Sequence, residues 1–290
     1  MDVSEYYKKF SYCASGPWYD GVYADRAACR SSARPFELLH SEKPDECWLF
    51  IHGYRGYPGE LVRPAVDLYE AGFDIYVPRL PGHGTSGADF IRSHSRDWVK
   101  LAENALHDLE GKYKTVHILS HSMGTAIAAL IGSGDKQVGK IVYACPSFEN
   151  LAMPFFVRLV LAVLSVFTPK VHCKWHASTK YHMHYENAPC DDEYYGKEYW
   201  QFYFTRQLLE YYRLAKRGLA SLKAHPHENL VIYPKRDEII SAPSVALYKK
   251  AVGSAANVAE IENGTHFIFY DCDEEAENSA VKAIVDFALK

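Results

Sequence analysis

The sequence predicts an α/β protein: a mostly parallel central sheet, helices on both faces, and a mainly helical insertion. Three observations lead to this class. Short apolar runs, often rich in β-branched residues, alternate with longer segments of helical character, which is typical of a parallel sheet covered on both faces. A chain of 290 residues, 48% of them hydrophobic, can bury a large core. One long stretch breaks the alternation and indicates an insertion.

Six apolar runs are predicted as strands, with helices between them. In chain order the strands are Cys47–Ile51, Asp74–Val77, Thr115–Leu119, Lys140–Ala144, Leu230–Tyr233 and Val258–Ile261. The helices are Gly59–Glu70, Arg96–Gly111, Met123–Gly132, Pro243–Val252 and Glu274–Leu289. Each boundary follows from a change of apolar period or from a turn residue.

Residues 148–225 contain no run of the buried-strand type. We therefore predict a cap inserted into an α/β core made of residues 1–147 and 226–290. The cap begins with the apolar segment Leu151–Phe167, which is slightly short for a membrane-spanning helix of about 20 residues and is interrupted by Pro154 and Arg158. Two interpretations stay open: a buried or half-buried cap helix, or a lid whose apolar face lines a lipid-like pocket or weakly contacts a membrane surface.

The composition excludes several classes of protein. With 23% charged residues the chain is neither disordered nor fibrous, and a net charge of −4 argues against a nucleic-acid partner. The seven cysteines are scattered, odd in number and form no C-x-x-C pair, which argues against a disulfide framework or a zinc site. The first twelve residues are polar and lack the apolar core of a signal peptide, so a cytoplasmic location is expected.

The strongest chemical signal lies where the strand Thr115–Leu119 meets the helix Met123–Gly132. The residues between and around them read Ser-His-Ser-Met-Gly, with Ser122 at the centre. A serine on a tight strand-to-helix turn needs small residues two positions before and after it, and the turn presents its hydroxyl near the positive end of the helix. Ser120 stands where glycine is usual, and Gly124 is the second small residue.

A serine that attacks a carbonyl group creates an oxyanion, which needs two backbone N–H donors. One donor is expected from Met123, the residue after the nucleophile, and the other from a loop after an early strand. The strand Cys47–Ile51 is followed by His-Gly-Tyr-Arg-Gly, so we predict the Tyr54 amide as the second donor. A glycine-rich turn without a catalytic role is the alternative. His83, in a later Pro-Gly-His-Gly turn, is interpreted as structural.

The serine also needs a base, and the base needs an acid that orients it. His266 follows the last predicted strand, in a loop of the kind where open α/β sheets place their sites. Asp237 follows the strand Leu230–Tyr233 and is the predicted acid, with the neighbouring Glu238 as the alternative. The order Ser122, Asp237, His266 is that of α/β-hydrolases.

Taken together, these motifs resemble a known family. The motifs that carry the resemblance are HGYRG, RLPGHG, SHSMG, RDEII and GTHF. In these motifs the chain resembles the serine hydrolases of the α/β-hydrolase superfamily. It is nearest in pattern to bacterial carboxylesterases and monoacylglycerol-lipase-like proteins of the serine aminopeptidase S33 type. The resemblance spans about residues 34–290. It implies the α/β-hydrolase fold with a cap at 148–225, and ester hydrolysis through an acyl-enzyme without a metal or organic cofactor. Ser120 and Thr125 depart from the family's usual glycines.

The predicted function is therefore a serine-dependent carboxylic ester hydrolase. Its substrate is expected to be a small to medium ester with an apolar acyl or aromatic group. Candidate substrate contacts, besides the triad and the two amides, are His52, Gly53, His121, Phe155 and Leu159. For His121 a structural role is the favoured interpretation, because its side chain, adjacent to Ser122 in the chain, should point away from the serine. The alternatives are acyl transfer, amide hydrolysis or C–C bond hydrolysis on the same triad and, more distantly, a non-catalytic ligand receptor with this fold.

Two features of the cap remain. The cap also contains a cluster of potential metal ligands: His172, Cys173, His176, His182 and His184. Only the pair His172 and His176 has a convincing ligand spacing, so no metal is predicted. Eight of the 22 tyrosines fall within residues 148–225. Because tyrosine combines an apolar ring with a polar tip, these side chains are expected near the mouth of a pocket.

Overall fold

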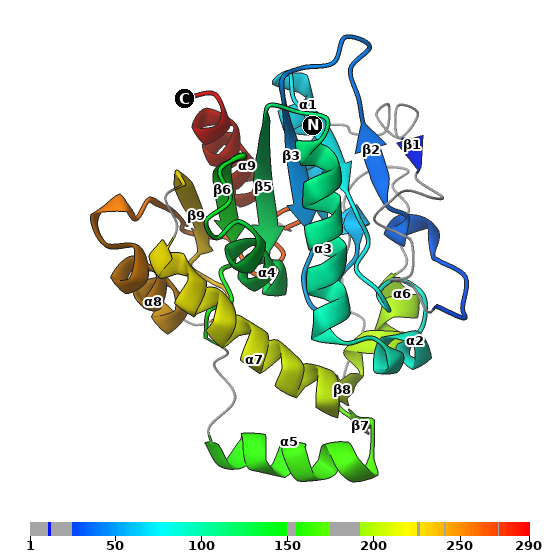
Figure 1. The fold of residues 1–290 in the computed structure, drawn as a ribbon. Coiled ribbons are helices and arrows are strands. Elements are labelled where there is room, and N and C mark those ends of the chain that lie inside the picture. The colour runs from blue at the N-terminus through cyan, green and yellow to red at the C-terminus, as the bar shows by residue number, and fades with distance from the viewer. Residues whose placement is uncertain are drawn as a thin grey trace.

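The computed structural model describes residues 11–12, 25–149, 155–174, 192–224, 227–240, 242–271 and 273–290. Within them the chain forms an eight-stranded sheet in the order β1-β2-β4-β3-β5-β6-β9-β10 (Figure 1). The strands are β1 (Ser11–Tyr12), β2 (Phe36–Leu38), β3 (Glu46–Ile51), β4 (Asp74–Val77), β5 (Thr115–His121), β6 (Val138–Ala144), β9 (Asn229–Pro234) and β10 (Val258–Ile261). At one edge β1 pairs antiparallel with β2, and β2 pairs antiparallel with β4. The pairs among β4, β3, β5, β6, β9 and β10 are parallel.

Helices cover both faces of this sheet, as the fold class predicts. They are α1 (Val62–Glu70), α2 (Gly87–Arg92), α3 (Ser95–Glu110), α4 (Met123–Ile131), α8 (Ala242–Val252) and α9 (Glu274–Ala288). α3 packs against α4 on one face and α1 against α9 on the other (Figure 1). The central strands β3 and β5 are almost entirely buried, because a parallel strand with helices on both sides has no solvent face.

All six predicted strands and all five predicted helices are present. β4 and β10 have the predicted limits, and the other elements differ by a few residues at their ends. The prediction missed β1, β2, the six-residue helix α2 and the two short strands within residues 148–225, Lys170–His172 and Phe202–Phe204. Elements this short contain too few residues to show a period in the apolar pattern.

The segment between β6 and β9 forms most of the lower part of the molecule in Figure 1. Its elements are α5 (Phe155–Phe167), β7 (Lys170–His172), α6 (Asp192–Tyr195), a π-helical turn (Gly196–Trp200), β8 (Phe202–Phe204) and α7 (Thr205–Ser221). β7 and β8 form a separate antiparallel pair. None of the described helices has the length and apolar character needed to cross a bilayer.

α7 joins this segment to the core by packing closely on α4. A Cβ atom added to Gly218 would lie 2.7 Å from the Cα atom of Ala126, so the two helices meet at small residues that let their backbones approach. α5 packs in turn on α7 and forms the outermost layer (Figure 1). The helix nearest the core is therefore α7, whereas the most apolar helix of the segment faces outward.

Candidate active site

Ser122 occupies a strained turn between β5 and α4. Its φ of 52° and ψ of −122° lie where residues with a side chain rarely occur, and such strain is typical of functional sites. A Cβ atom on Gly124 would lie 2.2 Å from the carbonyl oxygen of Ile51, which explains the need for a small residue there. Ser120 is tolerated because its buried hydroxyl donates to the Val142 carbonyl at 2.8 Å in the neighbouring strand.

The predicted base and acid lie in line with this serine. Nε2 of His266 is 3.0 Å from Oγ of Ser122, and Nδ1 of His266 is 2.8 Å from Oδ2 of Asp237. The three residues follow β5, β9 and β10 in the chain, so the carboxyl ends of three parallel strands bring together groups up to 144 positions apart. A serine hydroxyl that donates to an imidazole, which itself donates to a carboxylate, is the arrangement that activates a serine nucleophile.

Asp237 rather than Glu238 is the acid of this chain of hydrogen bonds. The Asp237 side chain is 1% exposed, and Glu238 lies at the surface. Burial by itself would raise the pKa of Asp237. The His266 charge and hydrogen bond, with the amides of Ile240 and Ile239, outweigh burial and lower this pKa. Asp237 therefore stays ionised and can stabilise a protonated His266.

The loop after β3 approaches the serine from the other side. A Cβ atom on Gly53 would lie only 3.0 Å from Cβ of Ser122, so a glycine permits this contact. The amide of Gly56 closes the turn on the Gly53 carbonyl at 3.2 Å. The amides of Tyr54 and Met123 have no acceptor in the described part of the chain. Both remain available to a substrate oxygen.

His52, predicted as a substrate contact, has a different place in the structure. It is completely buried, its Nε2 accepts from the Leu80 amide at 3.0 Å, and its Nδ1 lies 3.0 Å from the Gly53 carbonyl. Burial lowers its pKa to about 3. The prediction was wrong because the ring connects the loops after β3 and β4 and has no nitrogen left for a ligand.

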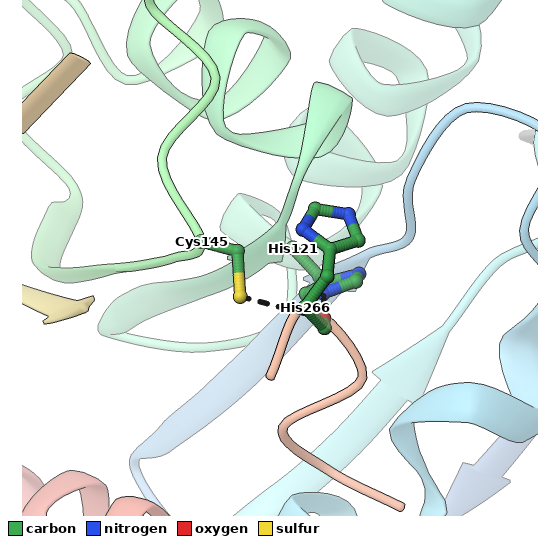
Figure 2. A group of neighbouring side chains, drawn as sticks. All are labelled: His121, Cys145 and His266. Carbon is green, nitrogen blue, oxygen red and sulfur yellow. Dashed lines mark hydrogen bonds between the residues drawn. The ribbon is translucent and has the colours of Figure 1, made fainter. Parts of the chain in front are cut away.

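His121, also predicted as a substrate contact, lies beside Cys145 and His266 (Figure 2). Its Nε2 donates to the His266 carbonyl oxygen at 2.8 Å, and the Cys145 thiol donates to the same oxygen at 3.5 Å. Burial lowers the pKa of His121 to about 3 and raises the pKa of Cys145 well above its ordinary value. His121 is therefore neutral, with its single N–H on Nε2, and Cys145 remains a thiol. Both hold the loop of the base, which agrees with the expected structural role of His121 and not with a substrate contact.

These same three side chains bring potential metal-binding atoms within 4.8 Å of one another. The thiolate is the form of cysteine that binds metals, and the raised pKa of Cys145 opposes its formation. The two donors also point at the His266 carbonyl, as Figure 2 shows for Cys145. The group is better suited to hold the backbone of His266 than to hold an ion.

The two remaining predicted substrate contacts, Phe155 and Leu159, belong to α5. Leu159 is 56% exposed on this outer helix, so the structure does not bring it to the serine. Phe155 begins α5, but its side chain lies outside the described residues, as do His176, His182 and His184. Among the described members of the histidine cluster, the His172 ring lies against Phe202 and the Cys173 thiol donates to the Trp200 carbonyl.

Tyr211 is a site residue that the sequence did not single out. Its hydroxyl is hydrogen-bonded to that of Ser147, and its ring stacks on Tyr54 with centroids 5.2 Å apart. Burial raises its pKa to about 12, against the opposing effect of hydrogen bonds with Ser147 and Ser122. The tyrosine-rich composition pointed to the cap as a whole. Only the rotation of α7 on α4 decides which of its tyrosines packs on the loop after β3.

Known proteins share this sequence pattern and fold. The family described as serine aminopeptidase, S33, matches residues 42–273. A thermostable monoacylglycerol lipase of Bacillus sp. (strain H-257) is 31% identical over 113 residues, which cover 39% of this chain and 44% of that lipase. The aligned part thus spans less than half of the relative.

Among solved structures, metagenome-derived lipolytic enzymes described as LipS and LipT give a TM-score of 0.73 at 19% identity, covering 89% of this chain and 99% of theirs. A soluble variant of the Saccharomyces cerevisiae monoglyceride lipase gives a TM-score of 0.69 at 12% identity, covering 96% of this chain and 98% of its own. These likenesses show the fold. With the family match over most of the length, the chain belongs to the serine aminopeptidase S33 family of α/β-hydrolases.

Proposed function

We propose that this protein is a serine-dependent carboxylic ester hydrolase. The observation that carries the proposal is the continuous hydrogen-bonded chain from Ser122 through His266 to the buried Asp237. The amides of Tyr54 and Met123 beside the serine, which have no acceptor among the described residues, support it because an attacked ester needs donors at that place. Ester hydrolysis also agrees with the lipolytic relatives.

In the first half of the reaction, His266 Nε2 accepts the proton of Ser122 while Oγ attacks the ester carbonyl carbon. The carbonyl oxygen becomes an oxyanion between the Tyr54 and Met123 amides, and Asp237 stabilises the imidazolium. His266 then gives its proton to the alcohol oxygen, the C–O bond breaks, and the alcohol leaves. An acyl group remains on Ser122.

In the second half, a water molecule gives a proton to His266 and attacks the acyl carbon. The same two amides receive the second oxyanion. When this intermediate collapses, Ser122 Oγ leaves and regains its proton from His266. The carboxylic acid departs and the resting hydrogen bonds form again, so the cycle consumes only ester and water.

An ester with an apolar acyl or aromatic group is the proposed substrate. The outer face of α5 supports this class: Phe156, Val166 and Phe167 are 66%, 78% and 80% exposed. An apolar helix face at the surface suits contact with a lipid surface that contains such esters. We propose a weak contact of this kind and no dependence on a metal or organic cofactor.

Vesicle flotation tests the lipid contact. The unmodified protein should float with neutral phosphatidylcholine vesicles, and Val166→Glu with Phe167→Glu should weaken this binding at least several-fold while leaving turnover of a water-soluble ester intact. Glu193→Gln, on the exposed start of α6, is the control. Equal flotation of all three proteins would contradict the contact.

The catalytic proposal is tested with Ser122→Ala. This variant should lose turnover of chromogenic esters and labelling by a fluorophosphonate probe. Ser221→Ala removes a hydroxyl that bonds only its own helix, at the Arg217 carbonyl, and should behave like the unmodified protein. Full activity of Ser122→Ala would overturn the assignment.

A substrate panel separates ester hydrolysis from the alternatives on the same triad. Anilides test amide hydrolysis, thioesters with added alcohols test acyl transfer, and C–C bond substrates test C–C bond hydrolysis, each compared with esters.

A further inference from the structure

The residue after the oxyanion donor Tyr54 is conformationally strained. Arg55 has a φ of 59°, in the left-handed region that favours glycine. In the described part of the chain the other two residues of this kind with a side chain are Ser122 and Cys145, one the nucleophile and the other a contact of His266. A non-glycine residue keeps such a conformation only where surrounding contacts offset its cost.

Contacts from the inserted segment hold Arg55 in place. Its Nη1 donates to the Phe202 carbonyl at 2.9 Å and lies 3.3 Å and 3.5 Å from the carbonyls of Tyr199 and Trp200. These three oxygens belong to the π-helical turn and to β8. The guanidinium thus ties the loop after β3 to a part of the chain about 145 residues away.

The Tyr54 ring is held by the same segment. It stacks on Tyr211 at an interplanar angle of 18°, with Phe90 5.2 Å away on an edge-to-face contact. Its hydroxyl is buried without a hydrogen-bond partner among the described residues. The position of Tyr54 therefore depends on ring packing and on its neighbour Arg55.

The helix that carries Tyr211 is itself fastened to the core. The side-chain amide of Gln207, through Nε2, donates to the carbonyls of Phe90, Ile91 and Ser93 at 3.1, 2.8 and 3.1 Å. One residue before Tyr211, Glu210 accepts from the Ser95 amide at 2.6 Å. α7 is consequently a fixed support, against which a loop can be held in one conformation.

We propose that the inserted segment positions the oxyanion hole, with Arg55 and Tyr211 as the positioning residues. The proposal rests on the proposed ester hydrolysis. Tyr54 lies in the chain between Gly53, which packs closely on Ser122, and Arg55, which is tied to the inserted segment. The position of the Tyr54 N–H therefore depends on both neighbours. If either tie is released, the amide moves away from the oxyanion while the triad remains intact.

Arg55→Ala tests this against a matched control, Arg206→Ala. Arg206 also donates across the same boundary, to the carbonyls of Ile91 and Ser93, but away from the oxyanion loop. The Gln207 side chain donates to the same two carbonyls, so α7 stays fastened when Arg206 is replaced. Arg55→Ala should lower kcat about 10- to 100-fold, somewhat less than loss of a whole oxyanion donor, with KM within about twofold. Its affinity for a boronic acid, which binds as a tetrahedral adduct, should fall by a similar factor. Arg206→Ala should keep kcat within about twofold.

Tyr211 supplies a second pair of variants. Tyr211→Leu removes the ring that stacks on Tyr54 and should lower kcat and boronic acid affinity together, whereas Tyr211→Phe retains this ring and should show a smaller loss of both. If Arg55→Ala is too unstable to assay, Arg55→Gln, which keeps one N–H donor, should show a several-fold loss of the same pattern. Equal kinetics for the Arg55 and Arg206 variants would overturn the inference, and full activity of Ser122→Ala would instead overturn the proposed function.

Discussion

Residues of the site divide into those whose chemistry is local and those whose role depends on distant contacts. Ser122 and Gly124 belong to the first group, because the turn between β5 and α4 requires a small residue beside the serine whatever lies around it. His52 and His121 belong to the second. Both stand next to motif residues, yet the structure turns their rings to the Leu80 amide and the His266 carbonyl.

Asp237→Asn should strongly impair ester hydrolysis. The amide cannot stabilise a protonated His266, so kcat should fall about 10³- to 10⁴-fold, as for other triads that lose their carboxylate. Steady-state kinetics with a chromogenic ester measures this. Glu238→Gln alters the exposed neighbouring carboxylate and should change kcat less than about twofold. A larger loss in the second variant would assign the acid to Glu238.

Among the secondary-structure elements, long strands and helices could be predicted from the sequence and the contacts between helices could not. The strands Asp74–Val77 and Val258–Ile261 have the predicted limits because their apolar runs end at turn residues. α5 is apolar around most of its circumference, and such a helix does not reveal which side packs. The structure turns Leu159 outward and places Tyr211 of α7 against Tyr54, in the loop beside the serine.

Gly218→Ala should loosen the contact between α7 and α4. The added methyl group would lie 2.7 Å from the Ala126 backbone, so the helices must separate, at a cost of about 1–3 kcal/mol in the free energy of unfolding. Urea denaturation measures this cost. Gly111→Ala is the matched control, since its new methyl group meets nothing nearer than 3.5 Å and its φ is −69°. Equal stability of the two variants would contradict the tight contact.

The whole molecule contains several histidines that are buried and neutral. Burial lowers the pKa of His52 and His121 to about 3, and the pKa of His83 well below its ordinary value of 6.5. The unfolded chain therefore binds more protons below pH 6.5, and the stability present above that pH is lost as the pH falls. The arrangement that fixes the loops of the site also makes the fold sensitive to acid.

Urea unfolding at about pH 7.5 and 5.5 measures this sensitivity. Each of the three histidines should contribute at most about 1.4 kcal/mol per pH unit below 6.5, so the free energy of unfolding should fall by up to about 4 kcal/mol. His83→Gln should remove about a third of that fall, because its ring no longer titrates. An unchanged free energy between the two pH values would contradict the buried, neutral state of these rings.

The sequence by itself determined the α/β class, the six parallel strands of the sheet, and Ser122, Asp237 and His266 as the residues to examine. These depend on contiguous features, since a buried strand, a tight turn and the order of loops after strands are all set along the chain. Only the tertiary structure decided that His52 accepts from the Leu80 amide, that His121 donates to the His266 carbonyl, that Tyr211 stacks on Tyr54, and that Arg55 is tied to β8. Such roles depend on the rotation of helices and on contacts across more than a hundred residues, where small differences in packing select one neighbour from many.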